Sequence, residues 1–120
     1  MSSEDRIERA RVLYERVAFD GDTGALATAE SELNAVEAGL ALARGRLLHA
    51  RFLREGNEDP VELRFFQRAT DLYRMLGDVR GEGEALFWVG CFHQVVRGDN
   101  QAAVPALERS AELAEQVVDK

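Results

Sequence analysis

The sequence predicts an all-α protein, and three observations lead to that fold class. Ala, Leu, Glu, Arg and Lys make up 60 of the 120 residues, a composition typical of long helices and helical bundles. Two of the residue types that favour strands are rare, with one Ile and three Thr. Turn signals rich in Gly, Asp and Asn divide the chain into segments of helical length, and apolar residues recur every three or four positions within them. We therefore expect helices throughout.

Length and charge limit the domain organisation and the classes of function. A chain of 120 residues is the size of one domain, so we expect a single domain over residues 1–120. The net charge of −7 gives no basic surface for nucleic acid. No apolar run is long enough for a membrane, and the first residues lack the features of a signal peptide. Cys91 is the single cysteine, which excludes an internal disulfide, and we expect a cytoplasmic protein.

Residues 3–37 are expected to form the first pair of helices. A serine at position 2 or 3 can cap the first helix, with Asp5 as the return partner of a capping box. Asp20-Gly21-Asp22 ends this helix, and Asp22 can cap the next one. Each helix has an apolar stripe: Ile7, Ala10, Leu13 or Tyr14, and Val17 in the first, and Leu26, Ala29, Leu33 and Val36 in the second.

Residues 39–76 are expected to form the second pair. Gly39 can separate the second and third helices, although one Gly costs only about 1 kcal/mol inside a helix, so a continuous helix stays open. The third helix ends at Gly56-Asn57-Glu58. Asp59-Pro60-Val61-Glu62 then predicts a helix start, with Asp59 as the cap, Pro60 at the first helical position and Glu62 returning a bond to the cap. Gly77 suits the left-handed position after this helix.

Residues 79–118 are expected to form the third pair. The fifth helix, roughly Glu82 to Arg97, is apolar nearly all round and should contact neighbours on more than one side. Gly98-Asp99-Asn100 ends it. The sixth helix contains Pro105, which we expect within the first turn because a proline further along removes a backbone hydrogen bond.

Six helices in this order predict three antiparallel hairpins, over about residues 3–37, 39–76 and 79–118. Each hairpin has its own turn of Gly, Asp or Asn residues, so the hairpins form a loose repeat of about 40 residues. Repeats of this length are typical of helical solenoids, in which neighbouring repeats bury a shared core.

The motifs of these hairpins carry a resemblance to a known family. Phe66 stands three residues before Ala69, and Val89-Gly90 forms an apolar-glycine pair. Over residues 60–116 this pattern resembles the tetratricopeptide repeat (TPR) family, in the long-repeat form found in bacterial regulators. The resemblance is looser over residues 38–56, through Arg44-Gly45, and residues 1–37 fit mainly by length. It implies three hairpins stacked as a right-handed TPR-like solenoid.

The resemblance also implies a function. In this family the first helices of the hairpins line a concave groove that binds peptides or partner proteins. We therefore expect a non-enzymatic protein-protein interaction module, a scaffold or regulatory adaptor, whose partner is a protein or peptide rather than nucleic acid or a membrane. A rigid surface of packed helices presents its side chains at low entropic cost, which suits this function.

Residues for the groove follow from the positions of two glycines. If Gly90 faces the neighbouring helix, a different stripe of the same helix is left to line the groove. Its members are Glu84, Phe87, Cys91 and Gln94, and with Gly45 in the same role Arg46 and His49 join them from the third helix. A place in the core is an equally open interpretation for Phe87 and Cys91.

Residues suited to catalysis or metal binding are not grouped in the sequence. His49 and His93 have no His or Cys at metal-ligand spacing, and Cys91 and His93 lie two residues apart, which puts them on different faces of a helix. We expect no enzyme activity, no cofactor and no metal. The alternative function is small-molecule sensing or sequestration, in an apolar pocket walled by Trp88, Phe87, Phe92 and Tyr73.

The last helix is expected to leave an apolar face uncovered, because helical-repeat arrays normally finish with a capping helix and none follows here. Two explanations stay open: the chain belongs to a longer array, or self-association covers the face. We favour a homodimer, with exchange of a terminal hairpin as one arrangement.

Overall fold

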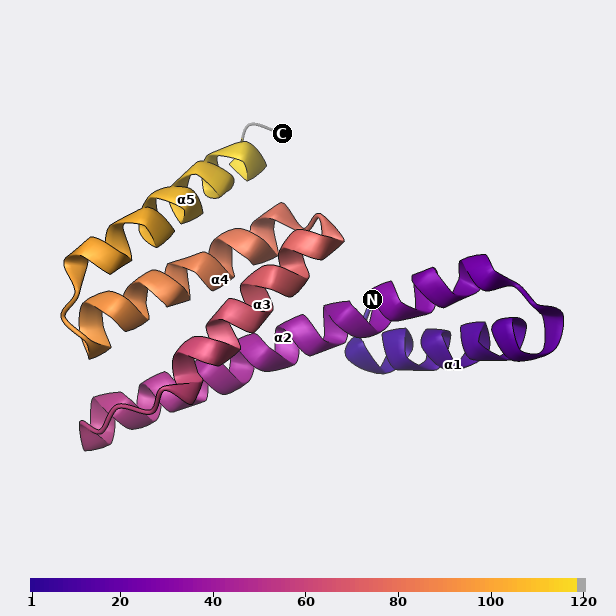
Figure 1. Ribbon diagram of the computed structural model, residues 1–120, viewed down its shortest axis with the longest axis horizontal. Helices are drawn as coiled ribbons and strands as arrows, with labels where there is room; N and C mark the ends of the chain where they lie inside the picture. Colours follow the sequence, from indigo (N-terminus) through magenta and orange to yellow (C-terminus); the bar gives the residue numbers. More distant parts are fainter. Residues whose placement is uncertain (119–120) are drawn as a thin grey trace. The chain divides into compact units, whose positions relative to one another are not determined.

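The computed structural model describes residues 1–118, and this part of the chain is built from helices (Figure 1). The helices are α1 (Ser3–Asp20), α2 (Thr23–Glu55), α3 (Val61–Leu76), α4 (Val79–Cys91) and α5 (Asn100–Val118), and a π-helical segment, Phe92–Val96, follows α4. No strand occurs within residues 1–118, which confirms the predicted all-α class.

The expected number of six helices is wrong, and the alternative that stayed open, a helix continuous through Gly39, is correct. Its 33 residues join the segments that we expected as the second and third helices. A glycine inside a helix costs only about 1 kcal/mol relative to alanine. This cost is too small to end a helix whose residues on both sides are strong helix formers.

The chain forms two compact units, residues 1–37 and residues 38 onward, and the first contains α1 and the start of α2. Arg6 Nη1 of α1 lies 3.0 Å from Glu32 Oε2 of α2. The core between these helices is small and consists of Ala10, Leu13, Ala25 and Ala29, with Val17 packed against them. The expected stripe of α2 is therefore only partly correct: α1 covers Ala25 and Ala29, and Leu26 and Leu33 stay half exposed.

The helix ends of the first unit follow the predicted local signals. Ser2 Oγ accepts a hydrogen bond from the Asp5 N–H at 3.1 Å, and Asp5 Oδ2 accepts one from the Ser2 N–H at 3.3 Å, which completes the capping box. Gly21, with a φ of 68°, ends α1 in the left-handed conformation. Asp22 Oδ1 then accepts from the Ala25 N–H at 3.2 Å. Each of these bonds joins residues close together in the chain, as the sequence predicted.

The second unit contains the remainder of α2, together with α3, α4, the π segment and α5. Phe66 of α3 and Phe92 of the π segment are fully buried in its core. The other buried members of this core are Ala41, Leu42, Ala69, Ala85 and Val89.

Two glycines allow helices of the second unit to pack closely. A Cβ added at Gly45 of α2 would overlap the ring of Phe66 in α3. One added at Gly90 of α4 would overlap the side chain of Leu107 in α5. The expectation that Gly45 and Gly90 face neighbouring helices is therefore correct.

The predicted limits of the fifth helix need two corrections. α4 begins at Val79, before the expected Glu82, because Asp78 caps it and its Oδ1 accepts from the Gly81 N–H at 2.8 Å. The expected α-helical end is π-helical over Phe92–Val96, and the Asp99 N–H donates to the His93 carbonyl at 2.7 Å. The wider π turn occurs next to the fully buried Phe92 ring.

Pro105 lies beyond the first turn of α5, contrary to expectation. Asp99 caps this helix, with its Oδ1 3.1 Å from the Ala102 N–H, so α5 begins at Asn100 and Pro105 is its sixth residue. Pro105 has no N–H to donate to the carbonyl of Gln101. Pro105 is exposed, so water can satisfy that carbonyl.

Candidate functional site

Four side chains from two helices of the second unit form a group that we call the exposed cluster: Arg46 of α2, and Glu84, Phe87 and Trp88 of α4. Arg46 Nη1 lies 3.6 Å from Glu84 Oε1. The Arg46 guanidinium carbon is 5.9 Å from the centroid of the Trp88 ring. Phe87 contacts Trp88 edge to face, with ring centroids 5.6 Å apart. The cluster therefore combines both signs of charge with two aromatic rings.

A buried pair of titratable groups lies against Trp88. His49 Nδ1 is 2.9 Å from Glu62 Oε2, and the His49 ring meets the Trp88 ring edge to face at 5.5 Å. The side chains of His49 and Glu62 are only 10% and 1% exposed. Burial raises the pKa of Glu62, although the hydrogen bond from His49 acts in the opposite direction. The second carboxylate oxygen, Oε1, has no hydrogen-bond partner.

The predicted role of Glu62 as the return partner of a cap is therefore wrong. Asp59 Oδ1 does accept a hydrogen bond from the Val61 N–H at 3.0 Å, but α3 begins at Val61 with Pro60 as its cap residue, one residue later than expected. Glu62, one residue later, faces α2 and bonds to His49 instead. The position of Glu62 at a helix start is the one that a capping box uses. Only the packing of α2 on α3 decides that Glu62 bonds to His49 and not to the cap residue.

A buried side chain of the core, Phe66, packs against the inner side of the exposed cluster. The Phe66 ring stacks on Trp88 with centroids 5.7 Å apart and an interplanar angle of 23°. Phe66 reaches this place because Gly45 leaves room for it against α2. Fully buried Phe66 thus fixes the distance between α2 and the aromatic face of α4.

A pocket of about 380 Å³ lies between α4 and α5 next to the exposed cluster. Glu84 and Phe87 belong to both features. The other residues around the pocket are mainly small or apolar: Val79, Arg80, Gly83, Ser110, Ala114, Val117 and Val118. This volume is in the range of pockets that bind small ligands.

The structure brings together three of the six predicted groove residues, Arg46, Glu84 and Phe87. His49 lies beneath Trp88 and is 8% exposed. Cys91 is half-buried, and burial raises the pKa of its thiol. Gln94 is exposed in the π segment.

Trp88 is the member of the cluster that the predicted stripe omitted. It stands four residues after Glu84, and this spacing places both on one face of a helix. We expected Trp88 only in the wall of a small-molecule pocket, although its spacing from Glu84 places it on the same side of the helix.

The described residues offer no centre for metal chemistry. Within residues 1–118, no group of three or more His, Cys, Asp and Glu side chains is placed to hold a metal ion. None of the helices in this range has the length and apolar character needed to cross a membrane.

Comparisons with protein-family models, with curated proteins and with solved structures found no match. The functional proposal therefore rests on the geometry of the second unit.

Proposed function

We propose that this chain is a non-enzymatic interaction module that binds a peptide or a partner protein on the exposed cluster. The observation that supports this function is that Arg46 of α2 forms an ion pair with Glu84 and lies over the ring of Trp88, both in α4, at the surface. Arginine and aromatic side chains are the residue types that contribute most binding energy in protein interfaces.

The ion pair within the cluster is weak enough to be exchanged for contacts with a partner. Arg46 and Glu84 side chains are 52% and 50% exposed, and their closest N–O distance is 3.6 Å. Exposed pairs of this kind contribute about 0–1 kcal/mol. A partner can therefore bond to either charge at small cost while its apolar side chains contact Phe87 and Trp88.

We further propose that the helices are arranged as in TPR proteins, with α2 and α4 as first helices of successive hairpins in a right-handed solenoid. The same close approach occurs twice in support of this arrangement: Gly45 against Phe66, and Gly90 against Leu107. In such an arrangement the first helices line the concave groove, and Arg46 and Glu84 lie on these two helices.

Selection of peptides by phage display, followed by calorimetry, tests the function. We expect the selected peptides to bind Phe87→Ala and Arg46→Ala at least tenfold more weakly than the original protein, a typical effect of losing an interface residue of these types. Arg64→Ala is the matched control, because Arg64 is exposed on α3 and outside the cluster. Unchanged affinity in both cluster variants would refute the proposed site.

The pocket between α4 and α5 supports a second candidate function, the binding of a small apolar molecule. Of the four aromatic residues predicted to wall such a pocket, Phe87 lines it, whereas Phe92 is fully buried in the core. A thermal-shift screen with metabolites tests this candidate, and Ala114→Trp, which fills the pocket, should abolish any stabilisation. Peptide binding that survives Ala114→Trp would separate the two functions.

A further inference from the structure

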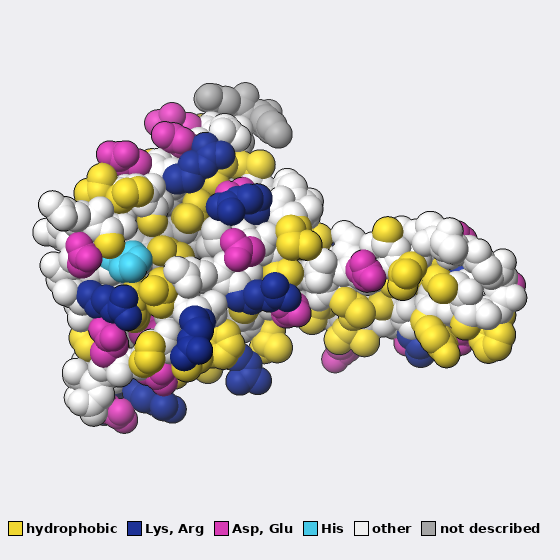
Figure 2. Space-filling view, viewed as in Figure 1, with side chains coloured by type: hydrophobic (Ala, Val, Ile, Leu, Met, Phe, Trp, Pro, Cys, Tyr) yellow, Lys and Arg dark blue, Asp and Glu magenta, His cyan; other side chains and the backbone are white. Residues whose placement is uncertain are grey.

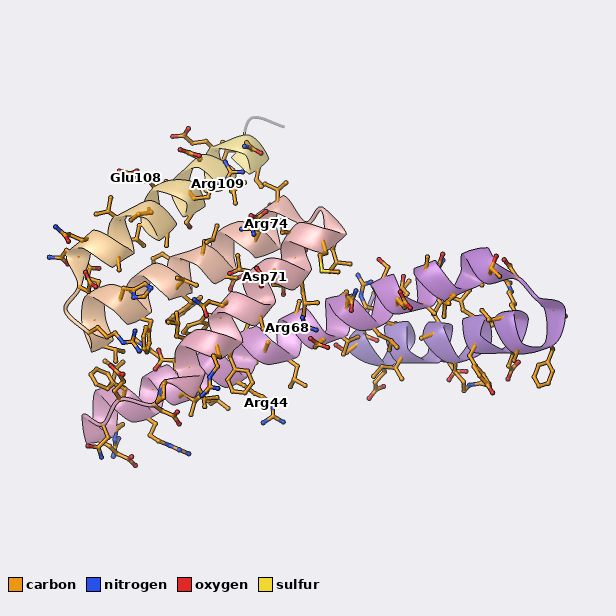
Figure 3. The ribbon with its side chains drawn as sticks, viewed as in Figure 1. Arg44, Arg68, Asp71, Arg74, Glu108 and Arg109 are labelled. Atoms are coloured by element: carbon orange, nitrogen blue, oxygen red, sulfur yellow. The ribbon has the colours of Figure 1, made fainter. Side chains whose placement is uncertain are left out.

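The part of α2 that belongs to the second unit is basic, although the chain as a whole is acidic. Residues 38–54 contain four arginines and no acidic residue, whereas the chain has a net charge of −7. Arg46 is paired with Glu84, but Arg44 and Arg51 are exposed and form no ion pair among residues 1–118. The Arg44 side chain extends away from the helices (Figure 3). These two charges are therefore available to a negatively charged partner.

Arg44 and Arg51 border a shallow depression between α2 and α3, which has a volume of about 290 Å³. Its apolar surface consists of Leu47, Leu48, Val61 and Phe65. Leu47 is 72% exposed, so much of this apolar surface meets solvent. Basic side chains lie beside hydrophobic ones on the surface of the second unit in Figure 2. The depression thus combines an uncovered apolar floor with two positive charges at its edge.

The spacing of the two arginines selects the shape of a partner. Arg44 and Arg51 are seven residues apart, which is about 10.5 Å along the helix, and Leu47 lies between them. A helix beside α2 repeats at the same interval, so carboxylates seven residues apart can reach both arginines while an apolar side chain between them meets Leu47. In an extended peptide this distance spans about three residues, and side chains three apart point to opposite sides. The spacing therefore favours a helix.

We propose that this depression binds an acidic amphipathic helix of a partner protein. Apolar side chains of the helix contact Leu47 and Phe65, and two carboxylates, one on each side of them along the helix, bond to Arg44 and Arg51. An amphipathic helix in an apolar groove is a recurrent mode of recognition. The complementary charges fix its register and exclude basic helices.

An anionic membrane is the other surface that attracts arginines beside exposed leucines. Two features of the depression favour a protein helix instead. Asp59 lies at its edge, and its Oδ1 accepts a hydrogen bond from the Val61 N–H, which holds a negative charge where an anionic bilayer would approach. The depression is also concave, so it fits individual side chains better than a flat layer of lipid headgroups.

This surface is separate from the exposed cluster. Successive residues of a helix are rotated by about 100°, so Arg46 points about 200° away from Arg44. The two sides of α2 therefore face different directions, and binding of an acidic helix does not depend on the proposed function of the exposed cluster.

Fluorescence anisotropy with a stapled, alanine-based peptide tests the proposal. The peptide has glutamates seven residues apart with two leucines between them, and the staple keeps it helical because short free helices are marginal in water. Arg44→Glu combined with Arg51→Glu should weaken its binding at least tenfold, since both attractions become repulsions. A matched peptide with lysines in place of the glutamates should bind this double variant at least tenfold more tightly than the original protein. Arg109→Glu, exposed on α5, is the control and should change neither affinity.

The gain of binding by the lysine peptide cannot arise from misfolding, and circular dichroism identifies any variant that fails to fold. Failure of the glutamate peptide to bind, or equal binding to the original protein and the double variant, would overturn the proposal. Vesicles of phosphatidylserine and phosphatidylcholine that bind the original protein but not the double variant, without binding of the peptide, would assign the surface to a membrane instead. A dimer in light scattering that the double variant dissociates, again without peptide binding, would show that a second copy occupies the depression. Both of these results would also overturn the proposal.

Discussion

Replacing His49 by alanine removes the hydrogen-bond partner of a carboxylate oxygen in the core. Glu62 is fully buried, its Oε2 is 2.9 Å from His49 Nδ1, and its Oε1 already has no partner. Removing one partner of a buried hydrogen bond leaves the other group unsatisfied, at a cost of about 1–3 kcal/mol and more where that group is charged. Burial already raises the pKa of Glu62, so proton uptake can relieve part of the penalty. We therefore expect a loss of about 3 kcal/mol.

Urea unfolding measured by far-UV circular dichroism and by fluorescence of Trp88, the single tryptophan, provides the assay. A loss of about 3 kcal/mol is a large part of the roughly 5–15 kcal/mol that stabilises a typical domain. Arg64→Ala, an exposed change on α3, is the control and should stay within about 0.5 kcal/mol of the original protein.

A double variant separates the charge effect from the loss of packing. His49→Leu combined with Glu62→Met replaces the pair with apolar groups of similar size, and such replacements are often neutral or stabilising. The double variant should therefore be clearly more stable than His49→Ala. If the double variant and His49→Ala have equal free energies of unfolding, or if His49→Ala is as stable as the control, the hydrogen bond of His49 to Glu62 does not contribute to stability as we expect.

Four further substitutions test the buried carboxylate, the close approach of two helices and the proline of α5. Because burial raises the pKa of Glu62 above the ordinary 4.5, the stability that its neutral form contributes is present below pH 4.5 and is lost as the pH rises through the raised pKa. Glu62→Gln should therefore make the free energy of unfolding, measured in urea, fall less above pH 4.5 than it does in the original protein. The same pH dependence in both proteins would contradict the burial of Glu62 as the cause. Gly45→Ala should cost about 1–3 kcal/mol through overlap with Phe66, whereas Gly39→Ala should stabilise by up to about 1 kcal/mol. Thermal unfolding compares the two variants, and Tm shifts of the same sign would be evidence against the close approach of Gly45 to Phe66. Pro105→Ala should stabilise α5 by about 1–2 kcal/mol in the same assay, and a lower Tm would show that α5 needs the proline.

Most signals that act within one turn of helix were readable from the sequence, and the exception is Glu62, which bonds to His49 of α2 instead of the helix cap. The capping box of Ser2 and Asp5 and the left-handed Gly77 at the end of α3 depend on residues close in the chain. The continuity of α2 could not be decided in this way. The cost of Gly39 is about 1 kcal/mol, which is comparable to the difference between ending and continuing a helix.

Part of the exposed cluster was also readable, because helical spacing alone places Glu84 and Phe87 on a stripe. The role of His49 was not, since its partner Glu62 comes from another helix and the pair forms only when α2 packs on α3. Leu26 was placed on the apolar stripe of its helix, yet it is half exposed. Its spacing marks it as part of an apolar stripe, but spacing does not say which side of the stripe α1 covers.

The most direct test of the proposed function is chemical-shift mapping by NMR with a selected peptide. If the exposed cluster binds the partner, the largest amide shifts should occur around Arg46 in α2 and over positions 84–88 in α4, and Phe87→Ala should abolish them. Shifts centred on α1, or on the side of α5 away from α4, with no change around Arg46 and Trp88, would contradict the account.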